Sequence, residues 1–272
     1  MIPKLEDVFG VSASPVLSYI QRTEVDDRFI EALKADKQIV VYGASKQGKT
    51  ALVQAHLPHD KHIVVRLTPK TGISDIYASV LRQLGIRLAE GSTDVSGREL
   101  SAKVKTSFKA YIPVFGGGEA GAEGGAKAQT RVDQTYKEIP FNLELPQDVS
   151  ELIKETGSQK AIILENFHYL DDERQKQLSF DLRTFQELGI RFVILGVWRE
   201  KNRLVQFNGD LVDRVIDIPV EPWEETDFLR VAKKGQEALN VVISEGLVSS
   251  CCDSAFSSIG VFQELLKEIC LV

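Results

Sequence analysis

The sequence predicts an α/β protein in which helices cover both faces of a parallel β-sheet, followed by a small helical domain. Five short apolar runs, rich in β-branched residues, recur before Pro222, and segments of helical periodicity separate them. Continuous apolar runs of this kind are typical of strands buried on both faces of a parallel sheet. After Trp223 the pattern becomes entirely helical. The chain therefore divides into a core at residues 1–222 and a helical, lid-like domain at residues 223–272.

The order of the elements follows directly from these patterns. Strands that alternate with helices in this way predict a βαβ succession with an α/β, doubly wound layout. The predicted strands are residues 38–42, 62–67, 160–164, 191–195 and 214–219. The predicted helices are residues 50–56, 73–84, 148–155 and 171–188 in the core, and 224–239, 248–254 and 261–271 in the C-terminal domain.

One insertion, at about residues 91–146, interrupts this alternation. Its centre, residues 115–125, consists almost entirely of glycine, alanine and glutamate. Such a composition buries little apolar surface, which predicts a flexible loop or a loose hairpin. The other interpretation is a contact with a partner or a second copy that becomes ordered on binding.

Composition limits the classes of partner and compartment. Lys and Arg total 33 against 39 Asp and Glu, a net charge of −6, which gives no support for a dedicated nucleic-acid binder. The N-terminus lacks a secretion signal, and no apolar stretch approaches the roughly 18 residues of a membrane span. The odd number of cysteines, Cys251, Cys252 and Cys270, indicates reduced thiols. We therefore expect a cytoplasmic protein without a membrane segment.

The strongest local motif follows the first predicted strand. Its pattern, G-x-x-x-x-G-K-[ST], is that of a P-loop for ATP or GTP, and it stands between a strand and a helix as its mechanism requires. Backbone amides of such a loop cradle phosphates at the positive end of the helix dipole. The lysine would bridge the β- and γ-phosphates, and the threonine hydroxyl would bind Mg²⁺. The residues of the motif are Gly43, Ala44, Ser45, Lys46, Gln47, Gly48, Lys49 and Thr50.

A second motif closes the third predicted strand, where an apolar run leads into Glu165 and Asn166. An acidic residue here is the Walker B pattern, so Glu165 joins Thr50 as a predicted metal-binding residue. Asn166 stands where many ATPases place a glutamate base; it can orient a water molecule but cannot take its proton. Asp171 or Asp172 could replace that base, although either would also serve as a helix N-cap. His168 is either a sensor of the γ-phosphate or a packing residue.

Together these motifs and the helical appendix resemble the AAA+ and STAND branch of ATPases, STAND denoting signal-transduction ATPases with numerous domains. Residues 19–24 are similar to the STAND signature that lies beside the base and ribose, with Gln21 where glycine is usual. The resemblance implies a P-loop NTPase fold with strand order 5-1-4-3-2, numbered along the chain, and a C-terminal helical lid. It also implies ATP as the nucleotide, with Mg²⁺.

The same resemblance implies roles for three arginines. Arg22 would contact the nucleotide, Arg199 after the fourth strand would sense the γ-phosphate, and Arg214 at the start of the fifth strand would be an arginine finger aimed at a neighbour's nucleotide. Each has a simpler interpretation. Arg22 could cap the following helix, Arg199 could begin a solvated helix, and Arg214 could pair with Asp210 or Asp213.

These features predict a slow ATPase that acts as a nucleotide-dependent switch and assembles with itself or with an effector protein. The resemblance extends to signalling and bacterial antiviral defence ATPases. Two alternatives stay open. One is a DNA-associated ATPase of the loader, replication or transposition type. The other is a nucleotide-dependent scaffold without hydrolysis, which Asn166 favours.

Overall fold

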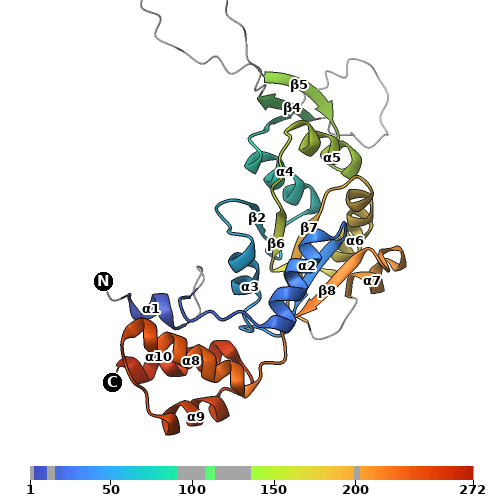
Figure 1. The fold of residues 1–272 in the computed structure, drawn as a ribbon. Helices are drawn as coiled ribbons and strands as arrows, with labels where there is room; N and C mark the ends of the chain where they lie inside the picture. Colours follow the sequence, from blue (N-terminus) through green and yellow to red (C-terminus); the bar gives the residue numbers. More distant parts are fainter. Residues whose placement is uncertain (1–2, 11–15, 91–107, 114–135, 199–202, 272) are drawn as a thin grey trace, which may run out of the picture. The chain divides into compact units, whose positions relative to one another are not determined.

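The computed structural model describes residues 3–10, 16–90, 108–113, 136–198 and 203–271 (Figure 1). They form two compact units, one from residues 1–71 and 160–272 and the other from residues 72–159. Each unit contains its own β-sheet.

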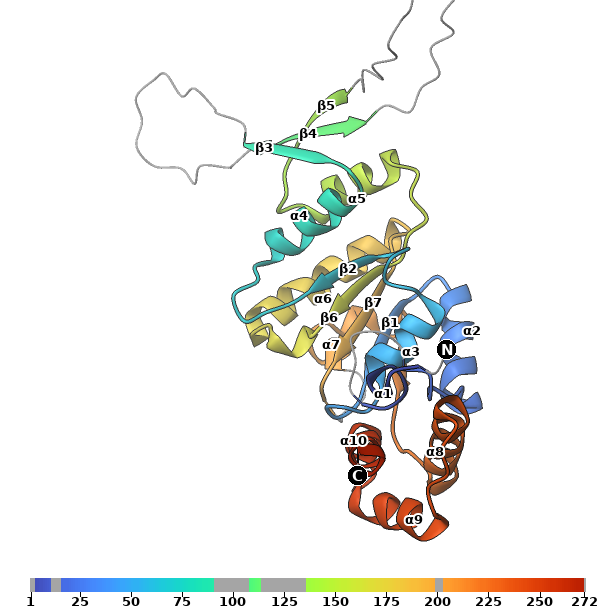
Figure 2. The same ribbon diagram turned by 90° about the vertical axis from the view of Figure 1, so that its left-hand side faces the viewer.

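The first unit is built on a five-stranded parallel sheet (Figure 2). Its order is β2-β6-β7-β1-β8, which is 5-1-4-3-2 when the strands of this sheet are numbered along the chain, so the predicted fold class and strand order are confirmed. The strands are β1 (Gln38–Tyr42), β2 (Ile63–Arg66), β6 (Ile162–Glu165), β7 (Phe192–Gly196) and β8 (Val215–Pro219). The helices before the C-terminal domain are α1 (Leu5–Val8), the π-helix η1 (Thr23–Asp27), α2 (Arg28–Lys34), α3 (Lys49–His56), η2 (Phe167–Tyr169), α6 (Asp172–Glu187), α7 (Arg203–Phe207) and η3 (Gly209–Leu211).

Helices pack on both faces of this sheet, which explains the unbroken apolar strands. Every residue of β1, β6 and β7 is buried. Ile39 and Val41 share one hydrophobic cluster with side chains of α2 and α3. Because side chains alternate along a strand, Gln38 points to the opposite face. There its amide donates to the Leu182 carbonyl of α6 at 2.9 Å.

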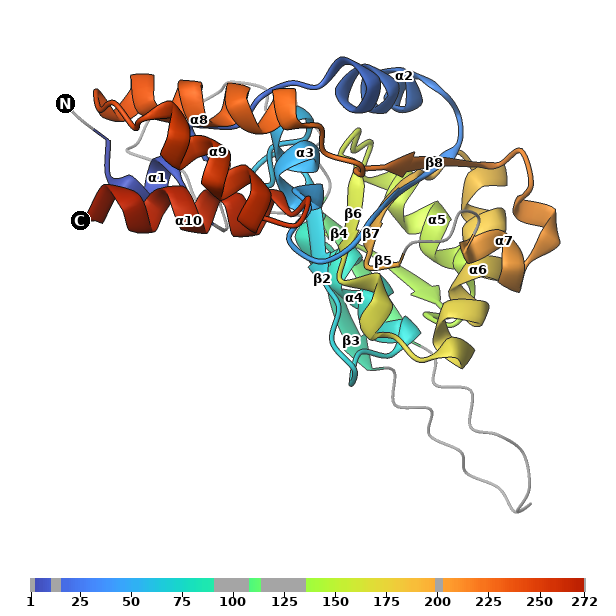
Figure 3. The ribbon, with the colours of Figure 1, turned by 90° about the horizontal axis from the view of Figure 1, so that it is seen from below.

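The C-terminal helices form a small bundle with its own core. The bundle consists of α8 (Glu225–Leu239), α9 (Glu245–Ser254) and α10 (Ile259–Leu271), close to the predicted ranges. Val8, Phe9 and Ile20 from the N-terminal segment belong to the same hydrophobic cluster, and α1 lies against α8 and α10 (Figure 3). A Cβ on Gly235 of α8 would lie 2.1 Å from the Phe9 ring, so this glycine allows the close approach. The bundle core thus includes residues that the predicted boundary at residue 222 assigns to the nucleotide core.

The second unit contains a three-stranded antiparallel sheet and two helices that contact each other. The strand order is β3-β4-β5, and β4 and β5 form the hairpin that was one reading of the insertion. The Gly/Ala-rich centre at residues 115–125 lies outside the described residues. The elements are α4 (Ile73–Gln83), β3 (Arg87–Glu90), β4 (Phe108–Pro113), β5 (Tyr136–Phe141) and α5 (Pro146–Glu155). Among the helices of the described ranges, none has the length and apolar character needed to cross a membrane.

Candidate nucleotide-binding site

The P-loop connects the C-terminal end of β1 to the first turn of α3. Three of its residues have positive φ angles: Gly43 at 150°, Lys46 at 61° and Gly48 at 82°. Glycine tolerates such angles at no steric cost. Gly43 is also constrained by space, because a Cβ there would lie 2.7 Å from Cγ2 of Val220. Both motif glycines are therefore explained by backbone geometry.

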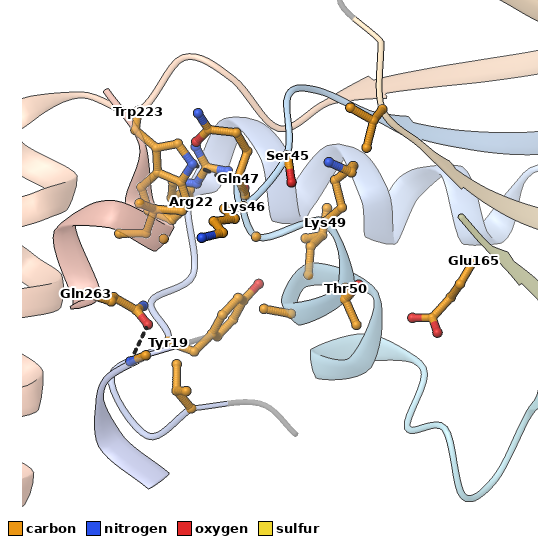
Figure 4. A pocket seen from close by; sticks show the side chains of 18 of the residues that line it. Tyr19, Arg22, Ser45, Lys46, Gln47, Lys49, Thr50, Glu165, Trp223 and Gln263 are labelled. Atoms are coloured by element: carbon orange, nitrogen blue, oxygen red, sulfur yellow. Dashed lines mark hydrogen bonds between the residues drawn. The ribbon is translucent and has the colours of Figure 1, made fainter. Parts of the chain in front are cut away.

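This loop borders a cavity of about 520 Å³ (Figure 4). Its walls come from the N-terminal segment, the P-loop, the ends of β2 and β6, and the C-terminal bundle. Gln263 of α10 accepts a hydrogen bond from the Gly10 amide at 3.2 Å at one side of it. A volume of this size suits a nucleotide-sized ligand. The motif residues on its wall are Ser45, Lys46, Gln47, Gly48, Lys49 and Thr50.

Lys49 is turned back onto its own loop. Its ammonium donates to the Gly43 carbonyl at 3.0 Å and to the Ala44 carbonyl at 2.6 Å. Burial lowers the pKa of Lys49 to about 8, and the negative charge of Glu221 partly opposes this shift. Phosphate oxygens are better partners for an ammonium than neutral carbonyls are. The residues therefore fit a triphosphate, with Lys49 free to exchange two loop carbonyls for phosphate oxygens.

The C-terminal bundle is hydrogen-bonded directly to the P-loop. The Gly260 amide donates to the Lys46 carbonyl at 2.9 Å, and the Gln47 side chain donates to the Ser257 carbonyl at 3.2 Å. The Trp223 indole donates to the Gln47 carbonyl at 3.3 Å. Residues 257–260 include no arginine or lysine that would indicate this contact in the sequence. They take part through their backbone groups, which leave no residue-type signal.

Arg22, predicted to contact nucleotide, lies on the wall of the cavity. It binds the segment between β8 and α8, residues 220–224, which we call the hinge. Its guanidinium donates to the carbonyls of Val220 at 2.9 Å and Pro222 at 3.2 Å, and stacks 3.7 Å above the Trp223 ring. Burial lowers its pKa, while the charges of Asp227 and Asp26 oppose that shift. Arg22 is also the N-cap residue of η1, but its side chain makes no capping hydrogen bond there and instead binds the carbonyls before α8.

Asp26 organises the N-terminal side of the cavity. Its carboxylate accepts from the Tyr19 hydroxyl and from the Arg22 amide, and lies 2.8 Å from His56 Nε2 on the helix that follows the P-loop. Burial and the hydrogen bond to Asp26 raise the pKa of Tyr19 well above its usual value. This cluster fixes residues 19–26 to α3 and so to the P-loop.

Glu165 ends β6 at the cavity wall, where the Walker B pattern predicts it. Its carboxylate faces Thr50 in Figure 4 and pairs with Arg66 Nε at 3.0 Å. A threonine hydroxyl and a carboxylate are oxygen donors of the kind that Mg²⁺ prefers, with phosphates and water completing its shell. Thr50 and Glu165 therefore fit the predicted Mg²⁺ site. The sequence motifs did not identify Arg66 as a site residue. Its position at the carboxyl end of a parallel strand, where ligands bind in α/β sheets, could have indicated it.

Asn166 and His168 follow Glu165 at the same edge of the sheet, and both lie on the cavity wall. Asn166 has a left-handed backbone, with φ 62° and ψ 36°. Burial lowers the pKa of His168, and the positive charge of Lys49 lowers it further. Its Nδ1 is buried and has no hydrogen-bond partner within the described part of the chain.

Neither aspartate suggested as a substitute base lies on the cavity wall. The Asp171 side chain caps α6 by accepting from the Arg174 amide at 2.9 Å. Asp172 pairs with Arg203 at 3.1 Å. The helix-cap interpretation of Asp171 is therefore confirmed by its hydrogen bond.

Of the two remaining predicted arginines, Arg214 does not line this cavity. Arg199 lies outside the described residues; the preceding Trp198 stacks on Tyr42 with ring centroids 6.5 Å apart. Arg214 is hydrogen-bonded to Gln186 at 2.6 Å and paired with Glu187 at 3.2 Å, so the suggested pairing with Asp210 or Asp213 is replaced by partners on α6. It directly precedes β8 and lies at the amino ends of the parallel strands, whereas the P-loop follows the carboxyl end of the neighbouring β1. A role as arginine finger therefore requires a second copy.

Several solved structures resemble this chain at low sequence identity. A Walker-type ATPase of Pyrococcus abyssi aligns with a TM-score of 0.53 and 11% identity, over 93% of this chain and 71% of its own. A STAND protein with a tetratricopeptide repeat sensor from Pyrococcus horikoshii aligns with a TM-score of 0.50 and 12% identity, over 93% of this chain and 30% of its own. A DNA replication initiation factor gives a TM-score of 0.48 and 13% identity, over 96% and 65%. No protein-family model and no curated protein matches the sequence. At these identities the likeness establishes the fold.

Proposed function

We propose that this chain, which has the P-loop ATPase fold of the AAA+ and STAND branch, is an ATP-dependent switch. The observation that carries the proposal is the direct hydrogen bonding of the P-loop to the C-terminal bundle. Lys46 and Gln47 belong to the loop that would hold phosphates, and both are bonded to Gly260, Ser257 or Trp223. A change in the loop conformation therefore acts on the bundle without an intermediate element.

Different side chains of the site bind different parts of the nucleotide. Lys49 exchanges the Gly43 and Ala44 carbonyls for the β- and γ-phosphates, and the loop amides cradle the remaining phosphate oxygens. Thr50 and Glu165 would hold Mg²⁺, which would neutralise charge on the triphosphate. Arg22 and Trp223 form the wall next to the hinge. We assign the apolar side of the cavity, with Ile20, Val231 and Ile259, to the base.

Switching then follows because the carbonyls that Lys49 holds and the groups that bind the bundle belong to one short loop. Phosphates withdraw Lys49 from the loop carbonyls and reshape residues 43–48, whose carbonyls hold the bundle. Closure controlled by a γ-phosphate is a common arrangement in nucleotide switches. The slow turnover we propose rests on Asn166, which lacks the carboxylate expected at that position.

We extend the proposal to assembly with a second copy or with an effector, in signalling or bacterial antiviral defence. A STAND protein with a sensor domain is among the structures with this fold, and this chain spans 30% of its length. By analogy, a sensor or effector function would come from a partner or from a separate segment.

The test of ATP binding compares the wild-type protein with Lys49→Ala. The wild type should bind ATP with Mg²⁺ in an equilibrium binding assay, and Lys49→Ala should weaken binding by at least about tenfold, because a charge-assisted phosphate contact is lost. Lys61→Ala, a lysine in the loop before β2 and away from the cavity, is the control and should bind like the wild type. No binding by the wild type, or equal binding by Lys49→Ala, contradicts the proposal.

The test of assembly is the mass of the purified protein with and without ATP. A shift to an oligomer with ATP supports a self-assembling switch. A monomer under both conditions removes self-assembly and leaves only an effector as partner.

A nucleotide-dependent scaffold without hydrolysis is the second candidate, and Asn166 is the observation that favours it. Single-turnover measurements on wild type and Asn166→Glu separate the two. A large gain in rate identifies position 166 as the brake, whereas no hydrolysis in either protein supports the scaffold.

A further inference from the structure

We propose that His168 is the general base for ATP hydrolysis in this chain, accepting a proton from the attacking water at Nε2. The inference rests on the proposed ATPase function and deepens it, because it identifies a general base, which the side chain at position 166 cannot be. It depends on where the acidic and basic side chains around the cavity lie and on what each is bonded to.

The carboxylates near the site are committed elsewhere. Glu165 pairs with Arg66, and its carboxylate faces Thr50, the other residue of the predicted Mg²⁺ site. Asp26 is bonded to Tyr19 and to His56 on the N-terminal side. A carboxylate that balances an arginine or a metal ion is a weak proton acceptor, because its charged form is stabilised.

Position 166 and the next two acidic residues along the chain give no base either. The side-chain amide of Asn166 does not take up a proton at neutral pH. Asp171 caps α6, and Asp172 is paired with Arg203. Among the described residues on the cavity wall, His168 is the remaining side chain that can accept a proton from water.

The position of His168 suits this role. The residue follows Glu165 by three positions, on the short helix η2 at the carboxyl end of β6, and it lies on the same cavity wall as Lys49 and Thr50. Its ring packs against Tyr169 with centroids 4.3 Å apart. The Nδ1 atom is buried, so Nε2 is the nitrogen left to meet the cavity.

The surroundings keep the ring neutral, as a base must be. Burial lowers the pKa of His168, and Lys49 of α3 is the charged group that lowers it further. On its own helix the neighbouring titratable group is Tyr169. Strand β7, which packs against η2, has no titratable side chain. A neutral imidazole whose pKa is below its usual value can accept a proton throughout the physiological pH range.

The step itself balances. The oxygen of water forms a bond to the γ-phosphorus as the bond from that phosphorus to the β,γ-bridging oxygen breaks. The water proton passes to Nε2 of His168, and the electron pair of the broken bond stays with ADP. The imidazolium then returns its proton to solvent or to the released phosphate.

The experiment measures single-turnover ATP hydrolysis and, separately, ATP affinity for wild type, His168→Ala and His168→Gln. Glutamine can still orient water through a hydrogen bond but cannot take its proton, so both variants should lose at least about a hundredfold in rate. Their ATP affinity should stay within about threefold of wild type, since the base contacts water and not the phosphates. His62→Gln is the matched control, because His62 lies before β2 and accepts from the Ala161 amide, a bond that glutamine can retain.

The pH profile provides a second readout that a purely structural role does not produce. The wild-type rate should stay level near neutral pH and fall as the pH is lowered from about 6.5 to about 5, because the protonated imidazole cannot accept a proton. This decline should disappear in the residual activity of His168→Ala.

Three results overturn the inference. They are a His168→Gln rate within about threefold of wild type, a wild-type rate that does not fall at low pH, and ATP binding by wild type with no hydrolysis. Failure of the wild type to bind ATP is a different result, and it contradicts the proposed function itself.

Discussion

The carboxylate of Glu221 accepts a hydrogen bond from the backbone amide of Ala44 at 2.9 Å. Glu221 lies in the hinge between β8 and the C-terminal bundle, whereas Ala44 is the second residue of the P-loop. The same carboxylate opposes the effect of burial on Lys49 by favouring its charged form. One side chain therefore links the segment before α8, the loop backbone and the protonation of Lys49.

The first prediction concerns the pH dependence of ATP binding. Burial lowers the pKa of Lys49 to about 8 in the nucleotide-free protein. Below this pH the lysine is already charged, so affinity should be constant. Above it the lysine must gain a proton on binding, so affinity should fall by up to about tenfold per pH unit. Fluorescence anisotropy with a labelled ATP from about pH 7 to about pH 9.5 measures this.

Lys49→Arg is the control for that profile, because a guanidinium keeps its charge over the whole range. Its affinity should not vary with pH, whatever its absolute value. A wild-type profile that is equally flat would show that Lys49 does not titrate in this window.

The second prediction is that Glu221→Gln moves the same decline to lower pH. Glutamine keeps an acceptor for the Ala44 amide but removes the negative charge that stabilises the Lys49 ammonium. The midpoint of the decline should therefore lie below that of wild type. Glu225→Gln, an exposed charge at the start of α8, is the matched control. An unchanged midpoint in Glu221→Gln would exclude electrostatic coupling between hinge and loop.

The third prediction is that Gly260→Ala weakens ATP binding by about tenfold. A Cβ at this position would lie 2.6 Å from Lys46 Cβ and 2.9 Å from its carbonyl oxygen. Because the crowded atoms belong to the backbone and the first side-chain atom, the bundle has to move away from the P-loop. Equilibrium ATP binding and thermal unfolding together separate a local effect from loss of the fold.

Gly246→Ala is the control for that substitution. Gly246 lies in α9 with no atom within 4 Å of the added Cβ, and alanine favours a helix by about 1 kcal/mol over glycine. It should bind ATP normally and unfold at the same temperature or slightly higher. If Gly260→Ala behaves in the same way, the contact between bundle and loop plays no part in binding.

The fourth prediction concerns stability of the C-terminal bundle. Gly235→Ala would place a Cβ 2.1 Å from the Phe9 ring, so it should destabilise the protein by about 1–3 kcal/mol through overpacking, despite its better helix propensity. Chemical denaturation measures the loss. Adding Phe9→Leu should restore part of the stability. A stabilised Gly235→Ala variant would show that α1 does not pack on α8 in solution.

The fifth prediction tests Arg214 as a finger supplied by a second copy. Arg214→Ala alone should cost less than about 1 kcal/mol in stability, because its ion pair with Glu187 is partly exposed. Its hydrolysis should nevertheless fall if neighbours use this residue. Mixing it with Lys49→Ala, which has an intact Arg214 but a defective P-loop, should restore activity. A mixture no more active than its parts would remove the finger role.

Elements with local signals were predictable from the sequence. The β-branched runs that form β1, β6 and β7 are buried on both faces of the sheet. Every residue in them is therefore apolar or buried, and the strands can be recognised without knowing which face each side chain occupies. The insertion was less predictable: its hairpin partners β4 and β5 lie far apart in sequence, and their pairing depends on backbone hydrogen bonds that any residues can make.

The sequence by itself determined the positions of the P-loop, residues 43–50, and of the Walker B residue Glu165, because each motif is contained in a few consecutive positions. The tertiary structure alone decided which distant groups meet them. Arg66 pairs with Glu165, Glu221 caps Ala44, and Gly260 contacts Lys46 through its backbone. Some contacts of this kind join residues more than 200 positions apart in the sequence. They depend on the strand order and on how the domains pack, and the residues next to each partner in the sequence contain no information about either.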